Sequence, residues 1–210
     1  MTRGLFVTFE GIDGCGKSTQ VQRAPEALRR EGRAVCVTRE PGGPAIAERI
    51  REMLMAPEHR EMTPACEVLL YLAARAQHVA QTIVPALERG DVVLCDRFAD
   101  ATLAYQGAGR GLPEDVLERM NAFATAGLAP DLTLLMDITV ELSRERLASL
   151  GRGHDRMESG AIEFYRRIRD GYLRLARRSP ERFVVLDGAR GLEENAGQVV
   201  AAIRGRLGAR

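Results

Sequence analysis

Five short runs of aliphatic and β-branched residues restrict the fold of this chain more than any other feature. The runs cover residues 5–10, 34–38, 92–95, 132–136 and 183–186. They are nearly continuous rather than alternating, as is typical of strands buried on both faces of a parallel sheet. Segments of helical character lie between them, at residues 17–31, 64–90, 113–127, 139–149, 161–178 and 192–207. This alternation predicts a doubly wound α/β fold around a five-stranded parallel sheet.

The rest of the sequence points to one ordinary domain. The 210 residues contain no internal repeat, and we expect a single domain over residues 1–210. A net charge of +1 gives no basic field that would attract nucleic acid. No segment reaches the ~18 apolar residues of a membrane span, and the N-terminal apolar run is too short for a secretory signal. We therefore expect a cytoplasmic protein with no nucleic-acid partner and no membrane partner.

The stretch "GIDGCGKST", residues 11–19, follows the first predicted strand and opens the first predicted helix. It holds the only lysine among 30 basic residues, and it fits the pattern G-x-x-x-x-G-K-[ST]. In such a loop the backbone N–H groups surround phosphates, the lysine reaches the β- and γ-phosphates, and the next hydroxyl holds Mg²⁺. We predict that ATP binds to Gly11, Ile12, Asp13, Gly14, Cys15, Gly16, Lys17, Ser18 and Thr19, with Lys17 catalytic and Ser18 a metal ligand.

The lone lysine also argues against a nucleotide-gated binding or scaffold protein, because it excludes the two commonest forms of such proteins. A guanine-specific switch protein needs a second lysine in N-K-x-D, and a partition-type ATPase needs one at the start of the loop. This chain has neither. Cys15 lies at a helix terminus, where a thiol pKa tends to fall. A small residue that simply fits the loop is the simpler interpretation of Cys15.

Charged side chains follow two other predicted strands. "TREPGG" (38–43) follows the second strand, and "DRF" (96–98) follows the third. Ligands of doubly wound sheets bind at the carboxyl ends of the strands. Asp96 is suited to Mg²⁺ through its water shell, and Arg39 and Arg97 offer planar forks to a second phosphate.

Seven stretches of the chain together resemble the thymidylate kinase family, whose members phosphorylate dTMP to dTDP. They are "FEGIDGCGKST", "TREPGG", "EVLLYLAARAQ", "DRF", "AYQGAGRG", "PDLTLLMDIT" and "DRMES". The resemblance implies a P-loop nucleoside monophosphate kinase fold, ATP and Mg²⁺ as phosphoryl donor and cofactor, and a role in dTTP supply for DNA synthesis. It also implies a homodimer packed through long helices such as residues 64–88.

The same resemblance implies roles for individual residues. Asp13 would bind the 3′-hydroxyl of the deoxyribose, and Arg39 and Arg97 would hold the dTMP phosphate. Asp96 would be a metal ligand that supports Mg²⁺, and both Arg97 and Asp96 would be catalytic. Tyr71 stands where the family usually has a phenylalanine that stacks on thymine, and Ala101 replaces a frequent serine. The remaining implied contacts are Arg75 to the base, Tyr105 against C2′ so that ribose is excluded, Thr102 and Gln106 in the same pocket, and residues 186–194 near adenine.

The family places its catalytic cation in one of two positions. In one pattern an arginine lies inside the phosphate loop, but here that position is Gly14. In the other pattern a short lid supplies the cation. Residues 150–160, "LGRGHDRMESG", suit such a lid and offer Arg152 and Arg156. We predict that one of these two arginines is catalytic, with Arg146 the next candidate.

Two related activities are the alternatives. A deoxynucleoside kinase would use Glu40 as general base for a 5′-hydroxyl. Such enzymes carry a motif like Glu-Arg-Ser after the third strand, where this chain has "DRF". Other nucleoside monophosphate kinases lack the "AYQG" segment. A phosphate monoester is largely dianionic near neutral pH and needs no base. Arginines that neutralise charge therefore matter more for transfer to a phosphate than a general base does.

Overall fold

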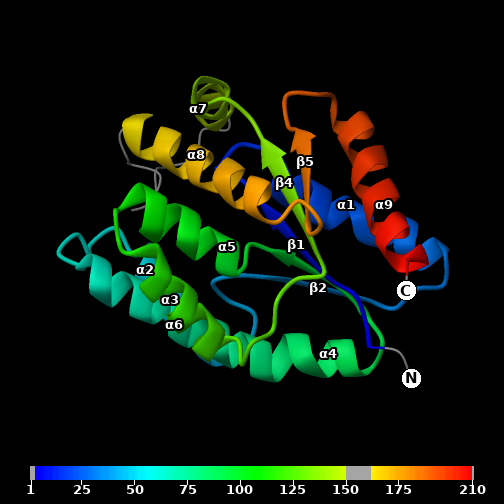
Figure 1. Ribbon diagram of the computed structural model, residues 1–210, viewed down its shortest axis with the longest axis horizontal. Helices are drawn as coiled ribbons and strands as arrows, with labels where there is room; N and C mark the ends of the chain where they lie inside the picture. The colour runs from blue at the N-terminus through cyan, green and yellow to red at the C-terminus, as the bar shows by residue number, and fades with distance from the viewer. Residues whose placement is uncertain (1–2, 150–161, 210) are drawn as a thin grey trace.

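The computed structural model describes residues 3–149 and 162–209. Its five strands are β1 (Phe6–Glu10), β2 (Val35–Arg39), β3 (Val92–Asp96), β4 (Leu132–Asp137) and β5 (Phe183–Asp187). They form one sheet in the order β2-β3-β1-β4-β5, and every pairing is parallel (Figure 1). The predicted α/β fold with a five-stranded parallel sheet is confirmed.

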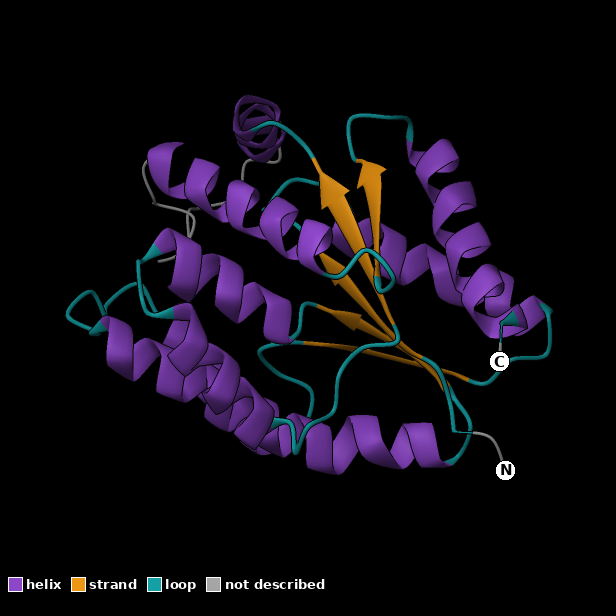
Figure 2. Cartoon of the chain, viewed as in Figure 1, coloured by secondary structure: helices purple, strands orange, loops and turns teal. Residues whose placement is uncertain are grey.

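Helices cover both faces of the sheet (Figure 2). Helices α1 and α9 pack together on one side, and α3 to α6 with α8 lie on the other (Figure 1). The helices are α1 (Lys17–Arg30), α2 (Ala45–Met55), α3 (Pro64–His78), α4 (Val84–Glu88), α5 (Ala99–Thr102), α6 (Glu114–Ala124), α7 (Val140–Ser149), α8 (Ile162–Arg178) and α9 (Leu192–Gly208). Two π-helical segments, Val79–Ile83 and Leu103–Gly109, join α3 to α4 and extend α5.

Helix boundaries differ from the sequence prediction in two places. Helix α1 runs from Lys17 to Arg30 with Pro25 inside it, close to the expected 17–31. The expected helix over residues 64–90 contains a π-helical segment at Val79–Ile83. Helix α2 was not predicted, although Ala47 and Leu54 on its inner face are buried at helical spacing. α2 packs on α3 and so belongs to the wall of the site.

The register of the sheet brings the functional segments together. β1 lies between β3 and β4, and Phe9 pairs with Asp96, which in turn pairs with Arg39 of β2. The carboxyl ends of β1, β2 and β3 therefore lie side by side at the same end of the sheet, close to the point where the strand order reverses. The three central strands, β1, β3 and β4, are almost completely buried, as their continuous apolar runs predict. The outer strands β2 and β5 are partly exposed, so burial on both faces does not hold for them. No helix in the described part of the chain is long and apolar enough to cross a membrane.

Candidate active site

The phosphate loop connects β1 to α1, whose first residue is Lys17. Gly14 has a φ of 76°, and a Cβ atom at this position would lie 2.8 Å from the carbonyl oxygen of Ser143 in α7. Conformation and the close approach of α7 therefore both require glycine here. This contact also leaves no room for the loop arginine of the other family pattern.

Helix α7 holds the back of the phosphate loop. The Ser143 hydroxyl donates a hydrogen bond to the carbonyl oxygen of Asp13 at 2.7 Å. Nη1 of Arg146 donates to the carbonyl oxygens of Gly14 at 3.3 Å and Gly188 at 2.9 Å. Carbonyls held at the back leave the loop N–H groups for the phosphate side. Arg146, the next candidate for the catalytic cation, is thus engaged with backbone.

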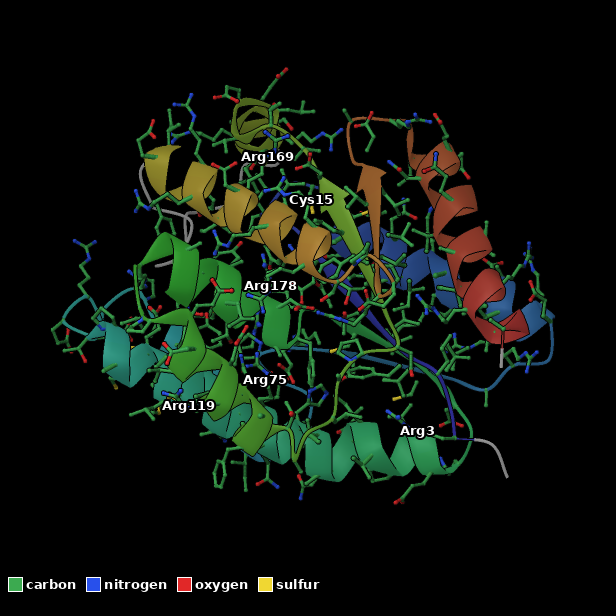
Figure 3. All side chains as sticks on the ribbon, in the orientation of Figure 1. Arg3, Cys15, Arg75, Arg119, Arg169 and Arg178 are labelled. Carbon is green, nitrogen blue, oxygen red and sulfur yellow. The ribbon has the colours of Figure 1, made fainter. Side chains whose placement is uncertain are left out.

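Cys15 is buried at the arrowhead end of the sheet (Figure 3). Burial raises the pKa of its thiol, and this effect outweighs the favourable charge of Lys17. The general tendency of a thiol pKa to fall at a helix terminus therefore does not apply to Cys15. The simpler interpretation, a small residue that fits the loop, agrees with the structure.

Lys17 and Arg97 meet at the carboxylate of Asp13. Oδ1 of Asp13 accepts hydrogen bonds from Nζ of Lys17 at 3.2 Å and from Nη2 of Arg97 at 2.6 Å. The Tyr105 hydroxyl donates to Oδ2 of Asp13 at 3.2 Å and accepts from Arg97 at 2.9 Å. Burial would raise the pKa of Asp13, but the Arg97 and Lys17 cations outweigh it and hold this pKa below its usual range. Asp13 is therefore ionised and shared between two cations.

Arg97 has a left-handed backbone, with a φ of 70°. Such a conformation is strained for a residue other than glycine and has to be held by its surroundings. The Phe98 N–H donates to Oε1 of Glu10 at 2.7 Å, while Nη1 of Arg97 donates to Tyr172, whose hydroxyl donates to Oε2 of Glu10 at 2.7 Å. Burial of Glu10, and then the charge of Asp100, raise its pKa to about 8.

Ser18 and Asp96 form a pair suited to a metal ion. The Ser18 hydroxyl donates to Oδ2 of Asp96 at 2.6 Å. Oδ1 of Asp96 is buried and has no hydrogen-bond partner among the described residues. The same part of the chain contains no cluster of three or more metal-ligating side chains. Mg²⁺ typically takes one or two protein oxygens and completes its shell with water and phosphate, so the pair fits Mg²⁺.

A pocket lies beside the phosphate loop. Its lining residues are Asp13, Glu40, Pro41, Arg51, Met55, Tyr71, Arg75, Arg97, Ala101, Thr102, Tyr105 and Gln106. All the residues predicted to bind substrate are among them except Arg39. The side chain of Arg39 is half-exposed, and its Nη2 pairs with Oε2 of Glu48 at 2.8 Å.

Arg75 is more deeply buried than a simple base contact requires, with a side-chain exposure of 2%. Nε donates to Glu40 at 2.8 Å, Nη1 donates to Thr102 at 2.9 Å and to Asn121 at 2.6 Å, and Nη2 donates to the carbonyl oxygen of Phe98 at 3.0 Å. Among the described residues these bonds use four of the five guanidinium N–H groups. One Nη2 hydrogen is left for a ligand. Figure 3 shows Arg75 among the helices on this side of the sheet.

Gln106 is held by a buried carboxylate. Nε2 of Gln106 donates to Oε1 of Glu67 at 2.9 Å, and Glu67 also accepts from Nε of Arg110 at 2.6 Å and Nη2 at 2.8 Å. A carboxylate can only accept hydrogen bonds. The Gln106 amide nitrogen is therefore directed to Glu67.

Three pocket residues, Pro41, Arg51 and Met55, were not predicted from the sequence to bind substrate. Nη1 of Arg51 donates to the carbonyl oxygen of Pro41 at 2.9 Å and so closes one side of the pocket. Arg51 and Met55 lie on α2, and the helical spacing of its apolar residues was the signal that could have placed them. The predicted lid, residues 150–160 with Arg152 and Arg156, lies outside the described residues.

Comparison with known proteins decides the family. The sequence profile described as "Thymidylate kinase" matches residues 9–199. The chain belongs to the thymidylate kinase family. A thymidylate kinase of Pelotomaculum thermopropionicum is 54% identical over 90% of this chain and 87% of its own. Those of Geotalea uraniireducens, 47% identical over 97% and 98%, and Deinococcus radiodurans, 48% identical over 98% and 99%, are similar over nearly their whole lengths.

Membership of the thymidylate kinase family gives the activity. The protein is an ATP-dependent kinase that phosphorylates dTMP to dTDP. Among the described residues, the base that the deoxynucleoside kinase alternative would use, Glu40, is already hydrogen-bonded. Both oxygens of Glu40 are engaged, one with Arg75 at 2.8 Å and one with His78 at 2.9 Å.

Proposed function

We propose that ATP binds with its phosphates on the loop of residues 11–19 and that dTMP fills the pocket beside it. One observation carries this proposal. Lys17, from the phosphate loop, and Arg97, from the pocket, donate to the same oxygen of Asp13. The γ-phosphate held by Lys17 and the acceptor phosphate held by Arg97 would then lie within reach of each other, as phosphoryl transfer requires.

Different pocket residues bind the base, the sugar and the 3′-hydroxyl of dTMP. Tyr71 stacks on thymine, one Nη2 hydrogen of Arg75 reaches the base, and Thr102 and Gln106 line the pocket around it. Tyr105 lies against the sugar, where its ring excludes a 2′-hydroxyl and its hydroxyl orders Asp13. Asp13 binds the 3′-hydroxyl, since a carboxylate with a lowered pKa remains a hydrogen-bond acceptor at neutral pH.

Arg39 joins Arg97 at the dTMP phosphate by changing partners. Its guanidinium now pairs with Glu48, and both side chains are partly exposed. An ion pair of this kind is worth little, on the order of 1 kcal/mol or less. A dianionic phosphate is therefore able to replace Glu48 as the partner of Arg39.

Ser18 and Asp96 would hold Mg²⁺, which supplies charge neutralisation between the donor phosphates. The chain itself contributes fixed cations, because a dianionic acceptor oxygen needs no proton removed and the obstacle is repulsion between two anions. Lys17 leaves Asp13 for the γ-phosphate, and Arg97 orients the attacking oxygen. Arg152 or Arg156 meets the charge on the transferred phosphoryl group as the lid closes.

An assay of ADP release tests the assignment of the acceptor. Purified protein receives ATP and Mg²⁺ with either dTMP or thymidine. Turnover with dTMP and little turnover with thymidine is expected. Faster turnover with thymidine would contradict the phosphate-acceptor site.

We also propose that the protein is a cytoplasmic homodimer. Its substrates are soluble nucleotides of the cytoplasm, and thymidylate supply serves dTTP synthesis for DNA. Two large apolar side chains support association: Leu69 of α3 is 55% exposed, and Phe123 of α6, which packs against α3, is 90% exposed. Light scattering of the wild type and of a Leu69→Asp, Phe123→Asp variant tests the dimer. A wild-type monomer would contradict it.

A further inference from the structure

His78 is a completely buried histidine that lies behind the substrate pocket. It is the last residue of α3, its exposure is 0%, and it is not among the residues that line the pocket. Its ring contacts the segment 38–43, "TREPGG", which follows β2. Nothing in the proposed transfer of the phosphoryl group uses this side chain.

The ring touches the segment 38–43 at three points. Nε2 lies 2.6 Å from the Thr38 hydroxyl oxygen, and Nδ1 lies 2.9 Å from Oε1 of Glu40. A Cβ atom at Gly43, whose φ is 97°, would lie 2.7 Å from Cδ2 of His78. One buried ring therefore sets the position of the start, middle and end of this segment.

The partners of the ring determine which ring nitrogen carries the hydrogen. Nδ1 faces a carboxylate, which only accepts, so Nδ1 carries the hydrogen. Nε2 faces a hydroxyl that is able to donate. Both ring nitrogens thus have partners when the ring is neutral, and the interaction runs from Thr38 through His78 to Glu40.

Glu40 connects His78 to the pocket, because its carboxylate contacts both His78 and Arg75. Oε1 accepts from His78, and Oε2 accepts from Nε of Arg75 at 2.8 Å. With the carboxylate held on both sides, the guanidinium of Arg75 is fixed in one orientation. Arg75 has a single Nη2 hydrogen left for a ligand, so the direction of that hydrogen depends on how the group is held.

We propose that His78 is a positioning residue for dTMP: its polar contacts orient the Glu40 carboxylate and thereby the Arg75 guanidinium that meets the base. The proposal rests on the assignment of this pocket to dTMP. It makes the hydrogen-bonding nitrogens of His78 important for the acceptor site and unimportant for the ATP site.

A set of substitutions separates the polar role of His78 from its packing. His78→Phe keeps a ring and removes both nitrogens. His78→Asn keeps a donor near the position of Nδ1, and His78→Gln reaches instead toward the position of Nε2. Thr38→Val removes the hydroxyl partner. His59, whose side chain is partly exposed, is replaced by Asn as the matched control.

Dissociation constants for dTMP and for ATP are measured by calorimetry, with unfolding temperatures and steady-state kinetics for each variant. His78→Phe leaves a buried charged acceptor without its donor, so we expect dTMP binding to weaken about 10- to 100-fold. ATP binding is expected to stay within about twofold of the wild type, since the ring does not touch the phosphate loop. His78→Asn should recover most of the dTMP affinity, and His78→Gln should not.

Several results would overturn the proposal. Unchanged dTMP affinity in His78→Phe would do so, and so would equal losses for dTMP and ATP, which indicate a structural role alone. If His78→Phe fails to fold, the Asn and Gln variants decide, and equal dTMP affinity in these two refutes the positioning role. Failure of the wild type to bind dTMP at all would instead refute the assignment of the pocket.

Discussion

Glu10→Gln is expected to remove a loss of stability that the wild-type protein undergoes between about pH 5 and pH 8. Glu10 is completely buried at the end of β1, and burial together with the charge of Asp100 raises its pKa from 4.5 to about 8. Between these two values the folded protein keeps a proton that the unfolded chain has released. The stability from this proton is fully present below the unfolded pKa and is lost as the pH rises through the folded pKa.

The size of the effect follows from the width of this window. Each pH unit inside it lowers the free energy of unfolding by about 1.4 kcal/mol. Between about pH 5.5 and pH 7.5 the wild type should lose on the order of 3 kcal/mol relative to Glu10→Gln, which has no titrating group there. Asp13 acts in the opposite direction: its lowered pKa gives stability that is present above its unfolded value of 3.8 and lost only below it. Measurements above about pH 5 therefore isolate Glu10.

Urea unfolding followed by circular dichroism gives the required free energies. The difference between wild type and Glu10→Gln is compared at three pH values across the window, so that titration of histidines cancels. Glu193→Gln, a change at an exposed carboxylate on α9, serves as the control. A wild-type minus Glu10→Gln difference that stays constant with pH would refute the raised pKa and the reasoning from burial.

The remaining predictions concern turnover. Lys17→Ala should lower kcat by about 10³-fold or more in a folded protein, because the loop backbone still forms without the clamp on the γ-phosphate; near-normal ADP release would exclude the phosphate-loop assignment. Tyr105→Ala should lower the ratio of kcat/KM for dTMP to kcat/KM for its ribose analogue, mainly because dTMP is phosphorylated more slowly. An unchanged ratio would show that Tyr105 does not exclude ribose. Replacing the responsible lid arginine, Arg152 or Arg156, by Ala should lower kcat by about 10²- to 10⁴-fold with little change in dTMP binding. The phosphate loop cannot supply a cation in place of the lid arginine, because α7 occupies the space that an arginine at position 14 would need. A normal kcat in both lid variants would show that the catalytic cation comes from neither Arg152 nor Arg156.

Local patterns in the sequence were sufficient for the sheet and for the phosphate loop. Buried parallel strands require continuous apolar runs, and a phosphate loop requires glycines and a lysine at fixed spacing between a strand and a helix. Because parallel strands end at one edge, the residues after β2 and β3 could also be expected in the site. Asp96 beside Ser18 meets that expectation.

Only the tertiary structure decided which partners the charged side chains have. Arg39 and Arg75 look alike in sequence, yet one is half-exposed and paired with Glu48, while the other is buried with Glu40, Thr102 and Asn121. Hydrogen bonds and ion pairs act over a few ångströms between residues far apart in the chain, and they depend on how helices pack on the sheet. A local pattern fixes which face of a helix is buried, but it carries no information about which acceptor that face will meet.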